Sequence, residues 1–163
     1  MEYHFEKIAD KDRKPIIDIF NYYIENSFAA YPSIKVTYEF FDMLLNLIRG
    51  YPAITVKTDS GQIVGFGFIR PANPADSFHG AAEISYFLAP EYTRKGIGKA
   101  ILDYLVAEAR KMKIYTILAS ISSLNIESIN FHLKYGFTEC GRFHKIGRKF
   151  GKEFDVVWMQ RMI

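Results

Sequence analysis

Cysteine is nearly missing from this chain, and long apolar runs are missing altogether. A single cysteine, Cys140, among 163 residues excludes an intramolecular disulfide framework and favours a reducing compartment. We expect Cys140 in the core, within a strand. No run approaches the roughly 20 apolar residues of a membrane-spanning helix, and residues 1–10 lack the apolar centre of a signal peptide. The sequence therefore predicts a cytoplasmic protein.

Charge of one sign is also scarce, since the formal net charge is only +3. That excess is too small to argue for a nucleic-acid partner. The four histidines are scattered without metal-ligand spacing: His4, His79, His132 and His144. We therefore predict no metal, no nucleic acid and no membrane partner. The composition that remains, 49% hydrophobic and 24% charged, fits one globular domain over residues 1–163.

Apolar periodicity and turn residues predict the order of the elements. Strands are expected at residues 3–8, 53–58, 62–70, 81–88, 114–121, 138–146 and 154–161. Helices are expected at residues 15–27, 37–50, 96–109 and 125–135, the second of them capped by Thr37. The order β-α-α-β-β-β-α-β-α-β-β predicts an α/β fold with a central mixed, twisted sheet and helices on both faces.

The sharpest local feature is the segment AAEISYFLAPEYTRKGIGKA at residues 81–100. A strand runs into a turn, and Gly96 and Gly98 stand where a helix begins. Free amides and the positive end of the helix dipole bind anions at such a place, and Arg94 and Lys95 add positive charge. The pattern indicates a phosphate site, although tight packing of helix on strand explains the glycines equally well. It is neither a Walker loop nor a dinucleotide fingerprint.

Two motifs resemble those of a known family. Residues 93–98, TRKGIG, resemble the Q/R-x-x-G-x-G/A pyrophosphate loop of the Gcn5-related N-acetyltransferase (GNAT) family, with Thr93 where Gln or Arg is usual. Residues 125–137, NIESINFHLKYGF, resemble the family's later N-x-x-S-x-x-(F/L)-(Y/H)-x-x-x-G-F segment. The resemblance implies the GNAT acyl-CoA N-acyltransferase fold and acetyl-CoA as co-substrate.

The resemblance narrows to one branch. The segments AEISYFLAPEY, NIESINFHLKYGF and GRKFGKEFDVVWMQ together look like the phosphinothricin acetyltransferase branch, which includes methionine sulfone and methionine sulfoximine acetyltransferases. The branch's G-x-K-x-G-x-x-x-D-V ending is reproduced by Gly147, Lys149, Gly151, Asp155 and Val156. This likeness implies a small-molecule amine substrate and a homodimer.

Cofactor-binding residues follow from the two motifs and the strand before them. We expect the group to comprise Phe87, Leu88, Ala89, Thr93, Arg94, Lys95, Gly96, Ile97, Gly98, Lys99, Asn125, Ser128 and His132. Asn125 is also a natural helix cap, and Ser128 could equally face solvent.

Acetyl transfer needs a base and a donor for the developing oxyanion. Glu83 is the predicted base, because a carboxylate in the apolar strand AAEISYFL should have a raised pKa. An edge-strand glutamate paired with a cation is the alternative. The resemblance implies a main-chain amide as the oxyanion donor, and we expect it to be that of Leu88. His132 either protonates the leaving thiolate, contacts the cofactor, or is simply packed.

Substrate contacts are predicted from the loops and from Glu83. The group comprises Phe28, Tyr31, Arg70, Phe78, His79, Glu83 and Lys149. The branch usually carries an Arg-x-Tyr-like element before the base, whereas this chain has Asp76 and Phe78. Arg70 or Lys149 could supply the missing positive charge, since a carboxylate bound without a cation binds poorly.

The predicted activity is acetyl-CoA-dependent acetylation of the primary amine of a small molecule, such as an amino acid or an analogue of the phosphinothricin, methionine sulfone or methionine sulfoximine type. Two alternatives remain. One is a protein N-terminal or lysine acetyltransferase, which would need an open groove. The other is a non-catalytic acetyl-CoA-binding module, against which the carboxylate of Glu83 in an apolar strand argues.

Overall fold

A computed structural model of the chain describes residues 2–163. The elements run β1 (Tyr3–Lys7), α1 (Arg13–Asn26), α2 (Phe40–Leu47), β2 (Ala53–Thr58), β3 (Ile63–Pro71), β4 (Ala81–Leu88), α3 (Ile97–Lys111), β5 (Thr116–Ser122), α4 (Ile126–Lys134), β6 (Thr138–Lys149) and β7 (Lys152–Met162), with short 3-10 turns at Asp10–Asp12, Asp76–Phe78 and Pro90–Tyr92. None of the helices in this described part is long and apolar enough to cross a membrane.

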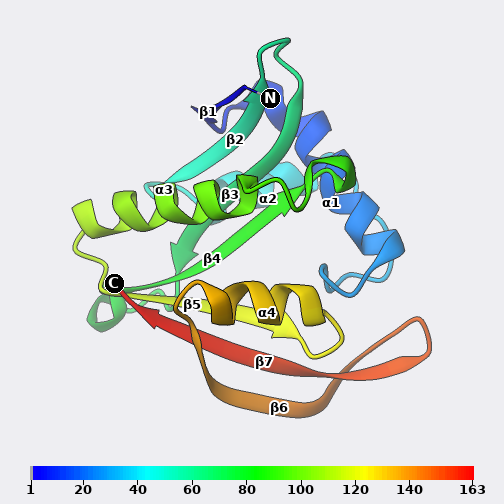
Figure 1. The fold of residues 1–163 in the computed structure, drawn as a ribbon, viewed down its shortest axis with the longest axis vertical. Helices are drawn as coiled ribbons and strands as arrows, with labels where there is room; N and C mark the ends of the chain where they lie inside the picture. Colours follow the sequence, from blue (N-terminus) through cyan, green and yellow to red (C-terminus); the bar gives the residue numbers. More distant parts are fainter. Residues whose placement is uncertain (1) are drawn as a thin grey trace.

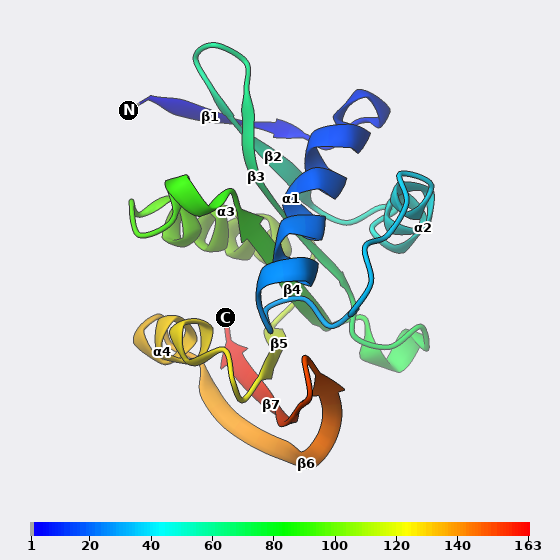
Figure 2. The same cartoon turned by 90° about the vertical axis from the view of Figure 1, so that its right-hand side faces the viewer.

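The strands form one mixed sheet in the order β1-β2-β3-β4-β5-β7-β6. Neighbouring strands are antiparallel except β4 and β5, which are parallel. Helices α1 and α2 lie on one side of the sheet and α3 and α4 on the other (Figures 1 and 2). The predicted α/β architecture with helices on both faces is confirmed.

Each face of the sheet has its own apolar core. Ile101, Leu102 and Leu105 of α3 are fully buried against one face. Ile16 of α1 and Phe41 of α2 are fully buried against the other face. The apolar stripes read from the sequence are therefore the ones that fix the helices to the sheet.

The sheet opens between β4 and β5. These strands pair only from Ala81 to Glu83, so the second half of β4 has no partner on that side. The Ala89 amide donates to the Val64 carbonyl of β3. Because antiparallel pairing alternates, the main-chain groups of Tyr86 and Leu88 then face the opening. A gap of this kind leaves unpaired amides and carbonyls available to a ligand.

The order of the elements agrees with the prediction, but three details were wrong. Helix α2 begins at Phe40, after a turn that starts at Thr37. The closing hairpin is longer than expected, because β6 and β7 continue to a two-residue turn at 150–151. Cys140 is exposed and not in the core, because β6 is the edge strand and almost all of its residues face solvent.

Candidate functional site

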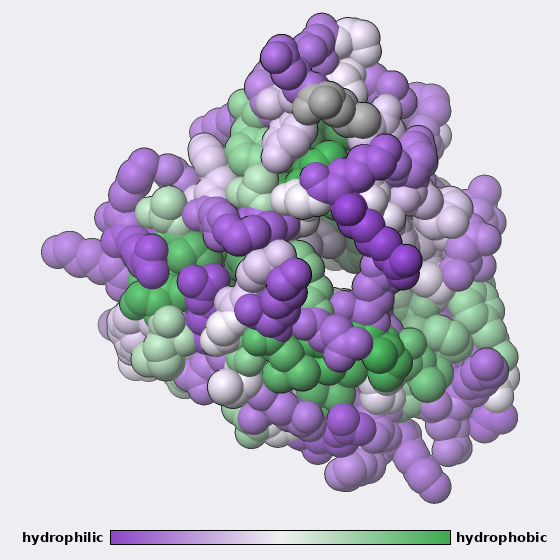
Figure 3. Space-filling view, in the orientation of Figure 1, coloured by the Kyte–Doolittle hydropathy of each residue, from purple (hydrophilic) through white to green (hydrophobic). Residues whose placement is uncertain are grey.

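Two cavities adjoin the opening in the sheet. The larger, of about 520 Å³, runs between the open half of β4, the N-terminal end of α3 and helix α4. Figure 3 shows a hollow on this face between the α3 and α4 regions. Its lining includes ten of the predicted cofactor contacts: Phe87, Leu88, Thr93, Arg94, Gly96, Gly98, Lys99, Asn125, Ser128 and His132.

The N-terminal end of α3 borders the larger cavity. Gly96 caps the helix with φ of 82°, a left-handed conformation that suits glycine. Arg94 has φ of 58°, so the backbone turns sharply just before the helix. Phe131 of α4 approaches Gly98, at 3.5 Å from where a Cβ would stand. The free amides of this first turn thus meet the cavity with positive side chains beside them, which suits an anion.

One acidic side chain also borders this basic end. Glu127 lines the larger cavity and accepts a hydrogen bond from Arg94 Nε at 3.1 Å. Both side chains are largely exposed. An anion at the end of α3 would therefore compete with Glu127 for Arg94.

A hydrogen-bonded chain joins α4 to β4 inside the larger cavity. His132 Nδ1 lies 2.7 Å from the Ser128 carbonyl, which can only accept, so Nδ1 carries the proton. The other nitrogen, Nε2, then accepts from the Tyr86 hydroxyl at 2.5 Å. Burial lowers the pKa of His132 and raises that of Tyr86 above its ordinary value. The pair is therefore neutral around pH 7.

Tyr23 of α1 contacts the C-terminal end of β4, the strand that borders the opening. Its hydroxyl donates to the Leu88 carbonyl at 2.6 Å, and burial raises its pKa to about 12. Its ring packs against the core beside Phe87. Tyr23 also lines the larger cavity.

The smaller cavity, of about 290 Å³, lies on the α1 and α2 side of the sheet. Three of the predicted substrate contacts line it: Tyr31, Arg70 and Glu83. The Tyr31 and Ser120 hydroxyls are 2.8 Å apart. Ser120 and Ser85 line both cavities, so the two spaces meet at the opening between β4 and β5.

Glu83 is the acid of the smaller cavity, two residues before Ser85 on β4. Arg70 lies opposite it on β3, and its Nη2 is 2.8 Å from Glu83 Oε2. Burial raises the pKa of Glu83 above 4.5, and the attraction of Arg70 only partly opposes that rise. A carboxylate with a raised pKa beside a cavity is suited to exchange protons with a bound molecule.

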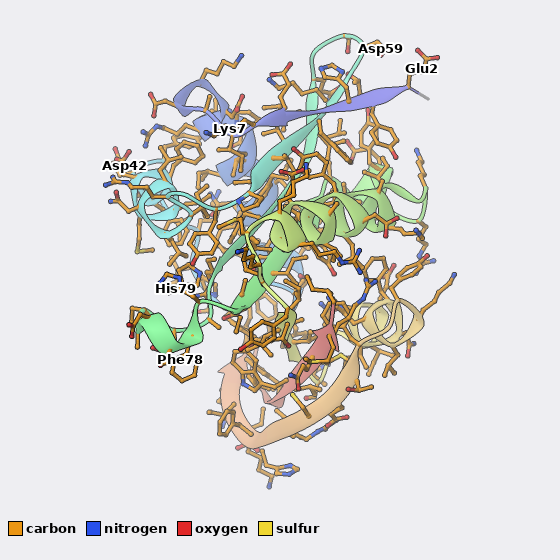
Figure 4. The ribbon with its side chains drawn as sticks, turned by 90° about the vertical axis from the view of Figure 1, so that its left-hand side faces the viewer. Glu2, Lys7, Asp42, Asp59, Phe78 and His79 are labelled. Atoms are coloured by element: carbon orange, nitrogen blue, oxygen red, sulfur yellow. The ribbon has the colours of Figure 1, made fainter. Side chains whose placement is uncertain are left out.

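Seven predicted contacts lie elsewhere. Ile97 is buried in the core and Lys95 is exposed over the ring of Tyr92, so neither they nor Ala89 lines a cavity. Phe78 and His79 are exposed at the outer end of the loop before β4 (Figure 4). The expectation that these two contact the substrate finds no support in their positions, because the loop turns away from both cavities.

The remaining two predicted substrate contacts lie behind the cavity wall. Phe28 packs against Phe150 and Phe154. The ammonium of Lys149 is buried and bonds two main-chain carbonyls. Neither side chain lines a cavity.

Several lining residues escaped the sequence reasoning, notably Ser85, Tyr86, Ser120 and Glu127. Tyr86 and Ser85 lie in the same strand as Glu83 and look like ordinary strand residues. Only the opening of the sheet turns them into cavity residues.

The chain resembles known proteins over most of its length. Residues 16–137 match the model of the acetyltransferase (GNAT) family. An L-methionine sulfoximine/L-methionine sulfone acetyltransferase of Salmonella typhimurium is 30% identical, over 94% of this chain and 91% of that protein. A protein of the same description from Pseudomonas paraeruginosa is 30% identical over 69% of this chain, and the match spans 65% of that relative's length.

Solved structures agree in fold. A phosphinothricin acetyltransferase from Sinorhizobium meliloti, in complex with AcCoA, has a TM-score of 0.93 and 25% identity, covering 100% of this chain and 89% of its own. A ribosomal-protein-alanine N-acetyltransferase from Brucella melitensis has a TM-score of 0.90 and 30% identity, covering 98% of this chain and 99% of its own.

Proposed function

The chain belongs to the acetyltransferase (GNAT) family, and from this we propose that it transfers an acetyl group from acetyl-CoA to the primary amine of an amino acid or a close analogue. The observation that carries the proposal is the meeting of the two cavities at Ser85 and Ser120. An anion-binding helix end lies on one side of that junction. A half-buried carboxylate, Glu83, lies on the other.

The larger cavity suits acetyl-CoA. Its volume of about 520 Å³ and its basic helix end fit a long ligand with a pyrophosphate. Gly96, Gly98 and Thr93 would face the pyrophosphate. Asn125 and Ser128 would flank the pantetheine arm, whose amides can pair with the open edge of β4. A structural relative bound to AcCoA supports this use of the fold.

In the proposed reaction Glu83 is the general base, directly or through one water. The amine enters protonated at neutral pH, and Glu83 accepts its proton. The amine nitrogen then forms a bond to the thioester carbon, and the carbon–sulfur bond breaks. The nitrogen releases its second proton to solvent, and the CoA thiolate takes one up from solvent. The Leu88 amide, which faces the opening, is proposed to donate to the carbonyl oxygen as negative charge develops there. The products are the N-acetyl compound and CoA.

The proton that CoA needs on leaving has a candidate path through the larger cavity. Tyr86 and His132 form a hydrogen-bonded pair of titratable groups in its lining, and Tyr23 is a third titratable group beside β4. Because burial holds His132 neutral, it is proposed as a cofactor contact that orients the Tyr86 hydroxyl, and solvent is the proton source.

A protein substrate is the second candidate, carried by the likeness to the ribosomal-protein-alanine N-acetyltransferase. The smaller cavity of about 290 Å³ argues for the small molecule, because it has room for one amino acid. The two candidates differ in the acceptor and share the chemistry.

The test is a thioester-consumption assay with acetyl-CoA and a panel of acceptors. The panel contains free amino acids, methionine sulfone, methionine sulfoximine, phosphinothricin, a polyamine and a peptide with an N-terminal alanine. We expect CoA release and an N-acetyl product, identified by mass, with free amino acids or their analogues. Acetylation of the peptide alone would favour the second candidate, and no release with any acceptor would leave a binding module.

A further inference from the structure

The lining of the smaller cavity is divided by chemistry. Four of its polar side chains, Arg70, Glu83, Ser85 and Ser120, come from strands β3, β4 and β5. The fifth is Tyr31 of the loop after α1, whose hydroxyl lies 2.8 Å from that of Ser120 at the sheet. The side chains that α1 and α2 supply are all apolar, with Phe20, Phe40, Met43 and Leu47 among them. A bound molecule therefore meets polar atoms at the sheet and apolar atoms at the helices.

The orientation of the acceptor follows from this division. The polar floor includes the junction with the larger cavity, so the reacting amine belongs there, beside Glu83. Arg70 holds Glu83 with one nitrogen, and its side chain is still 32% exposed, so further N–H groups are free for a carboxylate. With the amine beside Glu83 and the carboxylate beside Arg70, the side chain of the acceptor lies against α1 and α2.

Resting on the proposed function, we infer that this site selects α-amino acids with long apolar side chains over those with polar ones. Met43 and Leu47 line the cavity and are 57% and 42% exposed overall, so an apolar side chain bound there would cover part of their surface. A sulfone or sulfoximine in the same place would lose water without finding a donor on the helix wall. On this inference, the substrate preference of this chain differs from the substrates for which the methionine sulfoximine/methionine sulfone acetyltransferases are named.

The test compares kcat/KM for norleucine and phenylalanine with that for methionine sulfone, aspartate and n-pentylamine, at saturating acetyl-CoA. We expect the first two to exceed each of the others by at least about tenfold, the lower end of what an apolar pocket discriminates. n-Pentylamine tests Arg70, because it lacks the carboxylate. Equal or better use of methionine sulfone or aspartate would overturn the inference and leave the proposed function standing.

Two matched variants test whether the apolar wall formed by α1 and α2 causes the preference for apolar side chains. Met43→Glu puts a charge on the apolar wall and should lower kcat/KM for norleucine about tenfold or more, with acetyl-CoA affinity unchanged. Ile34→Glu is the control, since Ile34 is 80% exposed and lines neither cavity. Equal loss in both variants would contradict the placement. No CoA release with any amine would instead overturn the proposed function itself.

A different observation concerns Lys149, which the sequence assigned to the substrate. Only 3% of the residue is exposed, and its ammonium donates to the Ser27 carbonyl at 2.7 Å and the Ala30 carbonyl at 2.8 Å. No acidic side chain within residues 2–163 forms an ion pair with it. Burial accordingly lowers its pKa below 10.5. Because its hydrogen bonds go to two carbonyls of one loop, the buried ammonium stabilises the conformation of that loop.

That loop, residues 27–32, walls both cavities. Ala29 lines the two of them, and Tyr31 lines the smaller. The turn of the β6–β7 hairpin lies beside this loop as it leaves α1 (Figure 2). Phe154 stacks parallel to Tyr31 with ring centres 6.0 Å apart, and Phe150 meets Phe28 at 5.5 Å.

We propose that Lys149 is a positioning residue that fixes loop 27–32 in the shape the acceptor requires. It acts through Ser27 and Ala30 and does not itself touch the acceptor. Without the ammonium, two carbonyls lose charge-assisted bonds and the loop is released from the hairpin. The loop gives four residues (29–32) to the lining of the smaller cavity and only Ala29 to that of the larger, so acceptor binding suffers more than acetyl-CoA binding.

The test is Lys149→Met, which keeps the length and removes the donors. We expect KM for the acceptor to rise about tenfold or more, with kcat and the KM for acetyl-CoA within about threefold. Amide hydrogen exchange should quicken at residues 27–32 and stay unchanged in β4. Lys152→Met is the control, because Lys152 is exposed on the same hairpin.

A second variant covers the case in which Lys149→Met does not fold. Phe150 has φ of 53°, which asparagine tolerates, so Phe150→Asn removes the ring from Phe28 without straining the turn. It should raise the acceptor KM in the same direction by a smaller factor. An unchanged acceptor KM in a folded variant, or an equal rise for acetyl-CoA, would overturn the proposal.

Discussion

Arg94 and Glu127 form an exposed ion pair at the mouth of the larger cavity. If the pyrophosphate binds there, Glu127 both repels it and occupies Arg94. Glu127→Gln should therefore tighten acetyl-CoA binding about two- to fivefold at low salt, the range of an exposed pair. The gain should shrink in 0.5 M salt because screening is stronger. Calorimetry measures it, with Glu153→Gln as the exposed control. Weaker binding in the variant would argue against an anion beside Arg94.

Single residues were predictable where they break a local pattern. Glu83 stands out because it is charged in an apolar strand, and Gly96 because it precedes a helix. The contact of Arg70 with Glu83 depends on the register of β3 against β4, which the sequence does not reveal. Lys149 was predicted as a substrate contact from its place in a family motif, whereas its ammonium bonds two main-chain carbonyls and the residue lines neither cavity.

Helix α4 is tied to strand β4 by the bond between Tyr86 and His132. Burial keeps the pKa of His132 below 6.5, so the folded protein resists its protonation. Above pH 6.5 the group is neutral in both states and has no effect. Below it the unfolded chain binds the proton first, so the free energy of unfolding falls until the pH passes the folded-state pKa.

Urea unfolding at pH 7.5 and 5.5 checks this. Wild type should lose more stability over that interval than His132→Gln, by at most about 1.4 kcal/mol per pH unit for one proton. Groups other than His132 titrate alike in both proteins, so the difference isolates it. A difference that stays constant with pH would mean that His132 is protonated as easily in the fold as outside it.

Whole elements were easier to predict than their ends. Helices α1 and α3 were predicted from the helical spacing of their apolar residues, which are buried in the core. Strand β6 gives no such signal, because almost all of its residues are exposed, and so its length and the exposure of Cys140 were missed. The gap between β4 and β5, on which both cavities depend, is a property of the sheet and leaves no mark in either strand's sequence.

The assembled state is a further expectation. The resemblance to the phosphinothricin acetyltransferase branch implies a homodimer, and β6 offers an exposed edge that carries Phe143 and Ile146. Light scattering should give a mass of twice 18.8 kDa. Phe143→Lys with Ile146→Lys should reduce it toward the monomer if that edge is used. A monomeric mass for the wild type at high concentration would contradict the expectation.

We propose that acetyl transfer takes place where the two cavities meet and that Glu83 accepts the proton of the amine. Glu83→Gln keeps the size of the side chain and its burial but removes its basicity. The measurement is kcat for the variant across pH, together with acetyl-CoA affinity by calorimetry. Because the pKa of Glu83 is raised above 4.5, wild-type activity should fall on the acid side with a midpoint above that value.

In the variant, kcat should fall about 100- to 10,000-fold, the usual contribution of a positioned base. The acid limb should disappear or move, and acetyl-CoA should bind nearly as before. Near-normal turnover with the wild-type pH profile would contradict the claim, and the base would then have to be sought in a bound water or another side chain of the smaller cavity.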